Sequence, residues 1–339
     1  MKLLLKSAYH VARAFFALFT LRIQSHGSLI VLTYHRVLPD QHPAKEIEQP
    51  GMVISPRCLD KHISLLKNLA HPIAIDDWAT QRQQGTLNKK CYFAITFDDG
   101  WQDNFTYALP ILEKHQVPNT IFLVTKMIGT DANFWPNRLG QLIASILKIN
   151  PSLFSDTAFV NLCGMIDAKA PLAMSIDHAI NNAKKLSDTE IHEFLDEFYS
   201  QHTGLKEVTE RALLNFNEIE TLNQKAGTTF GSHTQSHCRL HSSLEAKRLH
   251  AEIIDSKQDL ETITPYQSSS FCYPNGDISK AAEKLIQQYY NSACTTAQGI
   301  NPPNCDPFKL KRFNLHNGNS DSSIRLLSTL LGKSESVYY

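Results

Sequence analysis

Two adjacent carboxylates and two closely spaced histidines are the residues of this sequence that could do chemistry together. Asp98 and Asp99 directly follow the apolar run 91–97, and His233 and His237 follow the run 228–231. Two carboxylates this close cannot both ionise cheaply without a nearby cation, so we interpret them as a metal ligand beside a general base. Imidazoles four residues apart lie on one face of a helical turn and can share one metal ion. One carboxylate and two histidines leave coordination positions for water and substrate, which predicts hydrolysis at a divalent first-row metal.

Each pair also has a plainer interpretation. Two acids after a strand are typical of a strand-to-helix turn with a capping side chain, and His237 and His241 have the same spacing as the pair above. The position in the predicted fold decides between these interpretations. Reactive residues of parallel sheets lie at the carboxyl ends of strands, and Asp98, Asp99 and His233 all follow predicted strands.

The elements that would position these residues alternate along the chain. Short runs rich in β-branched and aromatic residues predict strands at 29–34, 91–97, 120–125, 228–231, 269–273 and 291–295. Helical patterns lie between them at 56–69, 109–115, 244–260 and 279–290. This alternation predicts a parallel sheet, either open or closed into a barrel. A long helical stretch from residue 133 breaks the rhythm, and we interpret it as an insertion that either walls the site or only covers the barrel.

The composition excludes several classes of protein. The 339 residues are 42% hydrophobic and 19% charged, which indicates a folded chain long enough for one large α/β barrel or two domains. Lys plus Arg equal Asp plus Glu at 33 each, so we expect no nucleic-acid partner. The 7 cysteines form no C-x-x-C pair, which favours reduced thiols and the cytoplasm.

The first segment of the chain is apolar but interrupted. His10 and Arg13 break it, and the remaining run 14–21 is too short to span a membrane. On a helix, one face is apolar and the other is basic, which predicts peripheral membrane contact through residues 2–23. The apolar face holds Leu4, Ala8, Val11, Ala12, Phe15 and Phe19, and the opposite face holds Lys2, Lys6, Arg13 and Thr20. The alternatives are an export signal with a weak cleavage site at residues 25–27, and a plain packed helix. We therefore expect a cytoplasmic protein, peripheral on the inner membrane, with export as the alternative.

A third segment completes a set of motifs. Phe271-Cys272-Tyr273-Pro274-Asn275-Gly276 is a strand end that closes in a turn able to aim backbone N–H groups at an oxyanion. Together with T-F-D-D-G at 96–100 and S-H-T-Q-S-H at 232–237, it resembles the polysaccharide deacetylase (NodB-homology, carbohydrate esterase family 4) superfamily. Residues 214–219 and 103–112 fit the same pattern, and Thr33-Tyr34-His35-Arg36-Val37 resembles the opening strand of its biofilm and surface-polysaccharide branch.

The resemblance implies an α/β fold, a distorted (β/α) barrel of about seven parallel strands. We expect an amphipathic helix at 1–27 and the barrel at 28–339, with the helical insertion at about 133–212. Asp98 would be the catalytic base, and Asp99, His233 and His237 would bind a divalent metal. Zn²⁺ is the metal we expect first, with Co²⁺, Ni²⁺ or Mn²⁺ as alternatives.

The sequence departs from the better-known branch at two places. That branch has an arginine before the third motif, which tethers the base, and here Arg312 is the substitute we predict. The late histidine that acts as general acid has shifted spacing at His316, and His35 is the other candidate. A backbone N–H near Tyr273 would be the second donor to the oxyanion.

The expected activity is a metal-dependent hydrolase that removes acetyl groups from N-acetylated sugars of a bacterial-type surface polysaccharide or its precursor. Its partner would be an acetylated carbohydrate. Two alternatives stay open: a catalytically degenerate carbohydrate-binding or scaffold barrel, and an amide hydrolase that acts on a lipid-linked sugar.

Overall fold

The structure is a computed structural model that describes residues 2–23, 27–208, 210–264 and 268–331. The chain divides into two compact units. We call them the barrel unit, drawn from residues 1–38, 54–129 and 213–339, and the helical unit, drawn from residues 39–53 and 130–212.

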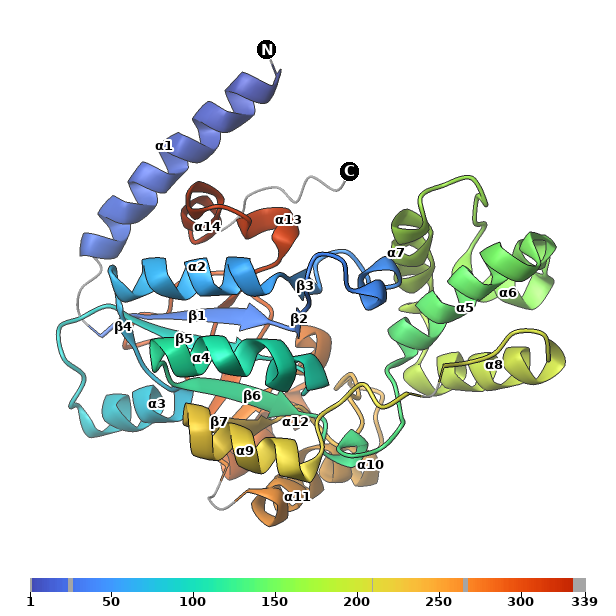
Figure 1. The fold of residues 1–339 in the computed structure, drawn as a ribbon. Helices are drawn as coiled ribbons and strands as arrows, with labels where there is room; N and C mark the ends of the chain where they lie inside the picture. Colours follow the sequence, from blue (N-terminus) through green and yellow to red (C-terminus); the bar gives the residue numbers. More distant parts are fainter. Residues whose placement is uncertain (1, 24–26, 209, 265–267, 332–339) are drawn as a thin grey trace. The chain divides into compact units, whose positions relative to one another are not determined.

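The barrel unit is built around one parallel sheet. Its strands lie in the order β10-β1-β5-β6-β7-β8-β9, with β4 beside β5 (Figure 1). The pairings between these described strands are parallel. The strands are β1 (Leu29–Tyr34), β4 (His71–Pro72), β5 (Tyr92–Phe97), β6 (Asn119–Leu123), β7 (Thr228–Ser232), β8 (Ser270–Cys272), β9 (Ser292–Cys294) and β10 (Arg312–Asn314). A separate two-stranded sheet contains β2 (Arg36–Val37) and β3 (Val53–Ile54).

One segment near the end of the chain connects the two edges of the large sheet. Leu310 lies beside the end of β9. Its N–H donates to the Ala293 carbonyl, and its carbonyl accepts from the Thr295 N–H, each at 2.9 Å. Two residues later β10 begins, and β10 pairs with β1. The sheet is thereby curled into the distorted (β/α) barrel of about seven parallel strands that the sequence predicts.

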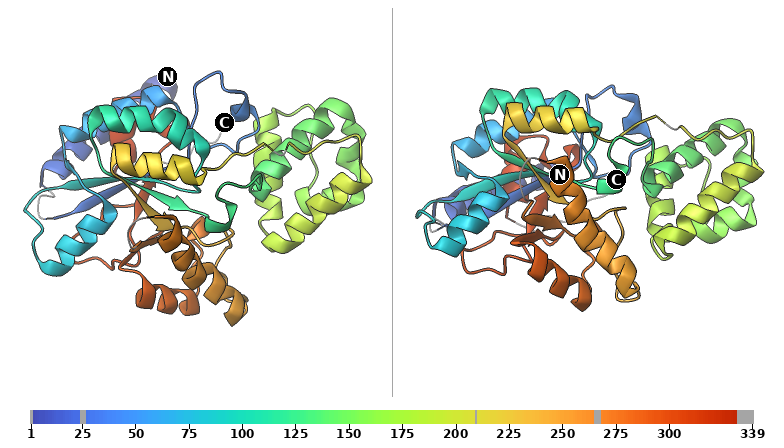
Figure 2. Two further views of the ribbon diagram at one scale, coloured as in Figure 1. Left: turned by 60° about the horizontal axis from the view of Figure 1, so that its bottom comes forward. Right: turned by 90° about the horizontal axis from the view of Figure 1, so that it is seen from below.

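Helices cover the outer face of this sheet. Helices α10, α11 and α12, in orange, lie outside β7 to β9 (Figure 2), and Leu249 of α10 and Ile286 of α12 pack with Phe271. The helices of the barrel unit are α1 (Lys2–Ile23), α2 (Pro56–Lys67), α3 (Ile75–Gln84), α4 (Leu109–His115), α9 (Phe216–Ala226), α10 (Ala246–His250), α11 (Ser256–Ile263), α12 (Lys280–Tyr289), α13 (Asn317–Ser320) and α14 (Ser323–Thr329). The stretch predicted as one helix at 244–260 is in fact α10 and α11 joined by a π-helical turn, Ala251–Asp255.

Strand β5 shows how the fold aims the first acid. Phe93, Ile95 and Phe97 pack in the outer core with the helices, whereas Tyr92 and Ala94 belong to a separate apolar cluster inside the barrel. Because successive side chains of a strand point to opposite faces, the side chain after Phe97 turns to the inside. The residue there is Asp98, at the carboxyl end of the strand.

The helical unit has an apolar core of its own. Its helices are α5 (Trp135–Ile149), α6 (Thr157–Cys163), α7 (Leu172–Ala183) and α8 (Asp188–Gln201). The helical patterns predicted after residue 133 lie here, together with residues 39–53, which the sequence analysis had placed in the barrel. A buried hydrogen bond of 2.8 Å from the Asn137 amide to the Glu48 carboxylate joins these two parts of the unit. The role of this unit as a wall of the site stays a prediction.

The N-terminal segment forms helix α1, and among the described residues no helix is both long and apolar enough to cross a membrane. Ser25 and His26 of the predicted cleavage site lie outside the described residues.

Candidate metal centre and catalytic groups

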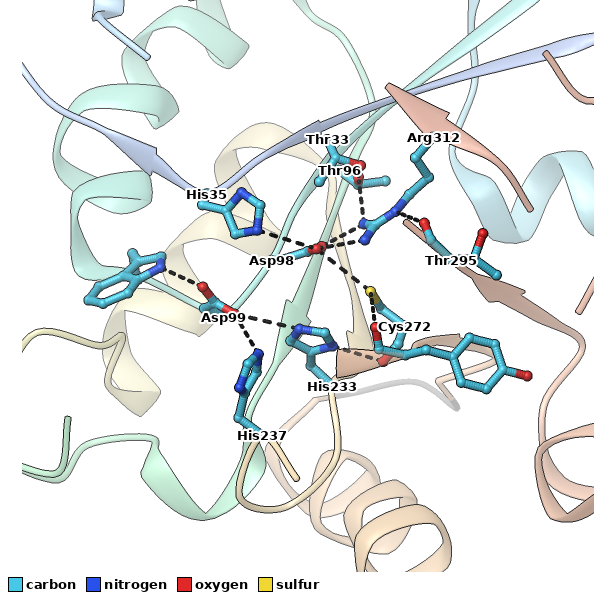
Figure 3. A network of polar contacts seen from close by, with 12 residues as sticks. Thr33, His35, Thr96, Asp98, Asp99, His233, His237, Cys272, Thr295 and Arg312 are labelled. Carbon is cyan, nitrogen blue, oxygen red and sulfur yellow. Dashed lines mark hydrogen bonds and ion pairs between the residues drawn. The ribbon is translucent and has the colours of Figure 1, made fainter. Parts of the chain in front are cut away.

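The turn after β5 separates the two adjacent acids. Asp99 has φ +74° and Gly100 has φ +78°, so two consecutive residues are left-handed. A Cβ on Gly100 would lie 2.7 Å from a methyl carbon of Leu123, which leaves space only for glycine here. The turn directs the Asp98 side chain into the barrel and the Asp99 side chain toward the loop after β7 (Figure 3).

Asp99, His233 and His237 come together at the carboxyl ends of β5 and β7. Asp99 Oδ1 lies 3.5 Å from His233 Nε2 and 3.5 Å from His237 Nε2 (Figure 3). The other oxygen, Oδ2, accepts a hydrogen bond of 2.9 Å from the Trp101 indole N–H. The three ligand atoms lie within 4.8 Å of one another, as a group that could hold a metal ion requires.

The donor set fits a divalent first-row metal. Zn²⁺ binds imidazole nitrogen and carboxylate oxygen at about 2.0–2.2 Å, which places neighbouring donors of a tetrahedral site about 3.3–3.5 Å apart. The separations of 3.5 Å from Asp99 to each histidine agree with that spacing. Three protein ligands are also the number found in catalytic zinc sites, where further positions take water or substrate.

His233 is held ready as a neutral ligand. Its Nδ1 lies 2.8 Å from the carbonyl oxygen of Cys272, which can only accept, so Nδ1 carries the proton and Nε2 presents its lone pair toward Asp99. Burial, with the neighbouring His237 as a smaller contribution, lowers the pKa of His233 to about 3. A metal ion binds the neutral imidazole, so the site needs no deprotonation of His233 at neutral pH.

The two histidines are not placed by a helical turn, and that part of the prediction is wrong. The segment after β7 is a loop in which Thr234 has φ +67° and His237 has φ +59°. Its backbone is bonded to a neighbouring turn, from the Thr125 N–H to the Thr234 carbonyl at 3.1 Å and from the Lys126 N–H to the Gln235 carbonyl at 3.0 Å. These contacts hold two non-glycine residues in a costly conformation, as is common at functional sites.

Glu252 holds the other side of the same loop. Its carboxylate accepts from the N–H groups of Gln235 and Ser236 at 2.9 and 3.0 Å and from the Ser236 hydroxyl at 2.7 Å. The Glu252 side chain is 1% exposed and also pairs with Arg248 at 2.6 Å. The buried Glu252 carboxylate thus fixes the backbone between the two histidines. Glu252 belongs to the π-helical turn that joins α10 and α11.

Asp98 lies beside this group and is paired with Arg312. The guanidinium donates to both carboxylate oxygens at 2.7 Å, and both side chains are 3% exposed (Figure 3). Arg312 also donates to the Thr295 carbonyl at 2.9 Å. Burial alone would raise the pKa of Asp98, but the charge and hydrogen bonds of Arg312 hold it well below its usual range. Asp98 is therefore ionised at neutral pH, and the structure brings Arg312 to the position predicted for the tether.

A second group of side chains also has metal-ligating types. Asp98, His233 and Cys272 lie within 4.8 Å of one another. Burial raises the pKa of the Cys272 thiol well above its usual value, so the sulfur stays protonated, and it lies 3.7 Å from Asp98 Oδ2 as a donor. Because Arg312 already pairs both oxygens of Asp98, these three side chains are less suited to bind a metal, and Asp98 is better suited to accept a proton.

Tyr273 lies at the end of β8, and its backbone N–H and ring both have partners. Its backbone N–H donates to the Cys294 carbonyl at 3.0 Å, which is a bond between neighbouring strand ends. Its ring is fully buried and packs edge-on against Phe271, in the apolar cluster that also contains residues of α10 and α12. The Tyr273 N–H itself is therefore already bonded, and a neighbouring backbone N–H of this turn as the second donor to an oxyanion stays a prediction.

The two histidines proposed as general acid have different surroundings. His316 caps α13, because its Nδ1 accepts from the Gly318 N–H at 3.1 Å. Burial, then the charges of Arg325 and His35, lower the pKa of His316 to about 4. His35 Nε2 lies 3.8 Å from Asp98 Oδ2, and His35 is partly exposed beside the site (Figure 3). The structure thus brings His35 next to Asp98, whereas His316 serves as a helix cap.

A comparison with protein families agrees with this geometry. The model of the polysaccharide deacetylase family matches residues 85–150 and 182–292, together more than half of the chain. The chain belongs to the polysaccharide deacetylase family. This family contains hydrolases that act on carbon–nitrogen bonds other than peptide bonds. YxkH of Bacillus subtilis (strain 168) is 48% identical over 42 residues, a segment that covers 12% of this chain and 15% of that protein.

Several solved structures have a similar fold. Streptococcus pyogenes deacetylase PplD in complex with acetate has a TM-score of 0.58 at 16% identity, covering 89% of this chain and 98% of that one. IcaB from Ammonifex degensii has a TM-score of 0.56 at 14% identity, with 89% and 97% covered. A de-N-acetylase from Aggregatibacter actinomycetemcomitans has a TM-score of 0.54 at 15% identity, with 88% and 99% covered.

Two residues of this candidate site had escaped the sequence analysis. Trp101 follows the Asp-Asp-Gly turn closely, and the signal that could have revealed it is an indole N–H two residues from a predicted metal ligand. Glu252 gives no local signal, because it is one acid in a helical pattern. Only the tertiary structure brings it to the loop between His233 and His237.

We predict that Glu252→Gln weakens metal binding. The partners of Glu252 are donors, so the new NH₂ group of glutamine could not replace one of the two accepting oxygens. The loop between the two histidines would then be held less firmly. Because partners that orient metal ligands typically contribute 10- to 100-fold to metal affinity, we expect a loss of about that size. Titration of the metal-free protein with Zn²⁺ by calorimetry measures it.

Glu261→Gln is the matched control, since Glu261 makes an ion pair with Lys257 on the next helical segment at 3.2 Å. It should leave the affinity unchanged. If Glu252→Gln lowers the unfolding temperature of the metal-free protein but keeps the metal affinity of the wild type, the positioning role is wrong.

Proposed function

We propose that this deacetylase-family chain is a metal-dependent hydrolase that removes acetyl groups from N-acetylated sugars of a surface polysaccharide or its precursor. One observation carries the proposal: an ionised carboxylate, Asp98, lies beside three side chains that fit a divalent metal. Support for the substrate class comes from the family match and from solved structures of the same fold, one described as a de-N-acetylase and one bound to acetate.

The chemistry divides between the ion and the side chains. When bound at Asp99, His233 and His237, a divalent metal supplies a Lewis acid that lowers the pKa of water toward about 7 and polarises the acetyl carbonyl. Asp98 accepts the proton of the attacking water, because it is ionised and Arg312 fixes its orientation.

His35 donates a proton to the departing sugar amine. It lies 3.8 Å from Asp98 and is partly exposed, so it can reach both the carboxylate and a substrate. Its Nδ1 is buried without a hydrogen-bond partner, which leaves Nε2 as the nitrogen that faces the site. His316 supports the site only as the cap of α13.

The scaffold alternative requires a site that has lost its chemistry. The base, its arginine tether and the three ligand atoms instead lie at distances suited to catalysis. The remaining alternative, an amide hydrolase on a lipid-linked sugar, keeps the same site and changes only the carrier of the sugar.

The native metal and the location are part of the proposal. We propose Zn²⁺, with Co²⁺, Ni²⁺ or Mn²⁺ as alternatives, because two imidazoles and a carboxylate suit all four ions. We propose a cytoplasmic location because all seven cysteines are free thiols. Export is the alternative.

Acetate release from an N-acetylated oligosaccharide should depend on the metal. We expect chelation to abolish the release and Zn²⁺ to restore it, measured by an enzymatic acetate assay on the full chain. Equal rates with and without chelator would eliminate the metal from the reaction.

Asp98→Asn should keep the metal and lose turnover, because an amide cannot take the proton. We expect kcat to fall by about 10²–10⁴-fold, the usual contribution of a general base, with Zn²⁺ affinity near that of the wild type. Asp77→Asn, in the exposed first turn of α3, is the matched control and should leave both values unchanged. Loss of the metal in Asp98→Asn would mean that the two adjacent acids have exchanged roles.

Substitution of the two histidines should separate the general acid from the cap. We expect His35→Gln to lower kcat by about 10²–10⁴-fold, whereas His316→Gln should keep kcat and lower stability by about 1 kcal/mol through the lost cap. Steady-state kinetics and thermal unfolding of both variants measure this. A large kcat loss in His316→Gln alone would reverse the assignment.

A further inference from the structure

Helix α1 packs on the barrel unit through one face. Ala14 and Ala17 are 6% and 1% exposed and belong to the outer core. Arg13 donates to the Ser328 carbonyl of α14 at 2.9 Å, and His10 lies 2.9 Å from the Ser328 hydroxyl. The small residues and these polar contacts therefore define the side of α1 that faces the protein.

The opposite side of α1 is apolar and exposed. Ala8, Val11, Ala12, Phe15 and Phe16 form this side, which we call the outer face of α1. Phe15 is 72% exposed, Phe16 is 62% exposed and Val11 is 36% exposed. A surface helix normally presents polar residues to water, so neighbouring exposed phenylalanines on one helix indicate an interaction surface.

The charge of α1 selects the kind of partner. Its sequence from Lys2 to Ile23 contains Lys2, Lys6 and Arg22 besides Arg13, and it lacks Asp and Glu throughout. A second copy that docked face to face would bring two cation-rich helices together without a compensating acid, which is repulsive. An anionic surface is complementary instead. Arg13 itself is turned toward α14, so the sequence-based view that it faces the headgroups is corrected.

We propose that α1 docks the protein on a phospholipid bilayer that carries anionic headgroups, with the outer face of α1 in the interface. The helix lies parallel to the bilayer, because an amphipathic helix with aromatic residues on one side and cations along its length binds in the plane of the interface. At 22 residues it is about 33 Å long. The proposal rests on α1 alone and is independent of the proposed activity.

The test uses the full chain and sonicated vesicles, either of phosphatidylcholine alone or of phosphatidylcholine with one-third phosphatidylglycerol. We expect co-sedimentation with the anionic vesicles. The double variant Phe15→Glu with Phe16→Glu should bind at least about tenfold more weakly, because two apolar side chains that would enter the bilayer are replaced by charges of the wrong sign. Acetate release from a soluble oligosaccharide should not change in this variant.

Tyr289→Glu is the matched control, since Tyr289 is an aromatic residue of α12 that is 43% exposed. It should bind vesicles as the wild type does. Phe15→Trp keeps the face apolar, and its emission should shift to the blue with anionic vesicles. Binding that is unaffected by the double variant, or a tryptophan that does not shift, would overturn the proposal. A dimer in sedimentation velocity that the double variant dissociates, without vesicle binding, would replace the bilayer with a second copy.

Discussion

The buried ion pair between Arg312 and Asp98 is the interaction on which the site depends. It joins β10, one of the last strands of the chain, to the end of β5, and both oxygens of the carboxylate are paired at 2.7 Å. Two charges this far from water are stable only with such complete pairing, and removing one partner of a buried pair typically costs about 3–5 kcal/mol. The same pair therefore fixes the charge state of the base and ties the end of the sheet to its centre.

The three side chains that fit a metal depend on a different constraint, which is backbone strain held by hydrogen bonds. Asp99 and His237 both have left-handed backbone conformations, which non-glycine residues adopt at a cost. Glu252 holds the loop of His237 from one side, and the Trp101 indole orients the carboxylate of Asp99. The side chains that fit a metal are thus few, and the residues that orient them come from distant segments.

Helix α1 shows how one helix can serve both the fold and an interface. Its small residues enter the outer core, while its phenylalanines stay exposed. Docking through such a helix would hold a deacetylase at a surface where a lipid-linked or growing polysaccharide is presented, without changing the site itself. The chemistry of the barrel and the location of the protein would then be controlled by separate parts of the chain.

The sequence by itself determined the alternation of strands and helices and the residues that end β5 and β7, because local apolar patterns and turn residues depend only on near neighbours. The strands at 29–34, 92–97 and 228–232 follow those patterns closely. Only the tertiary structure decided the partner of Asp98, the left-handed loop of the histidines, the position of His35 beside Asp98, and the hydrogen bond of the Tyr273 N–H. The three-residue β10 has no apolar run to mark it. These features depend on contacts between segments far apart in the chain. A local sequence pattern does not determine which distant segment will pack against it.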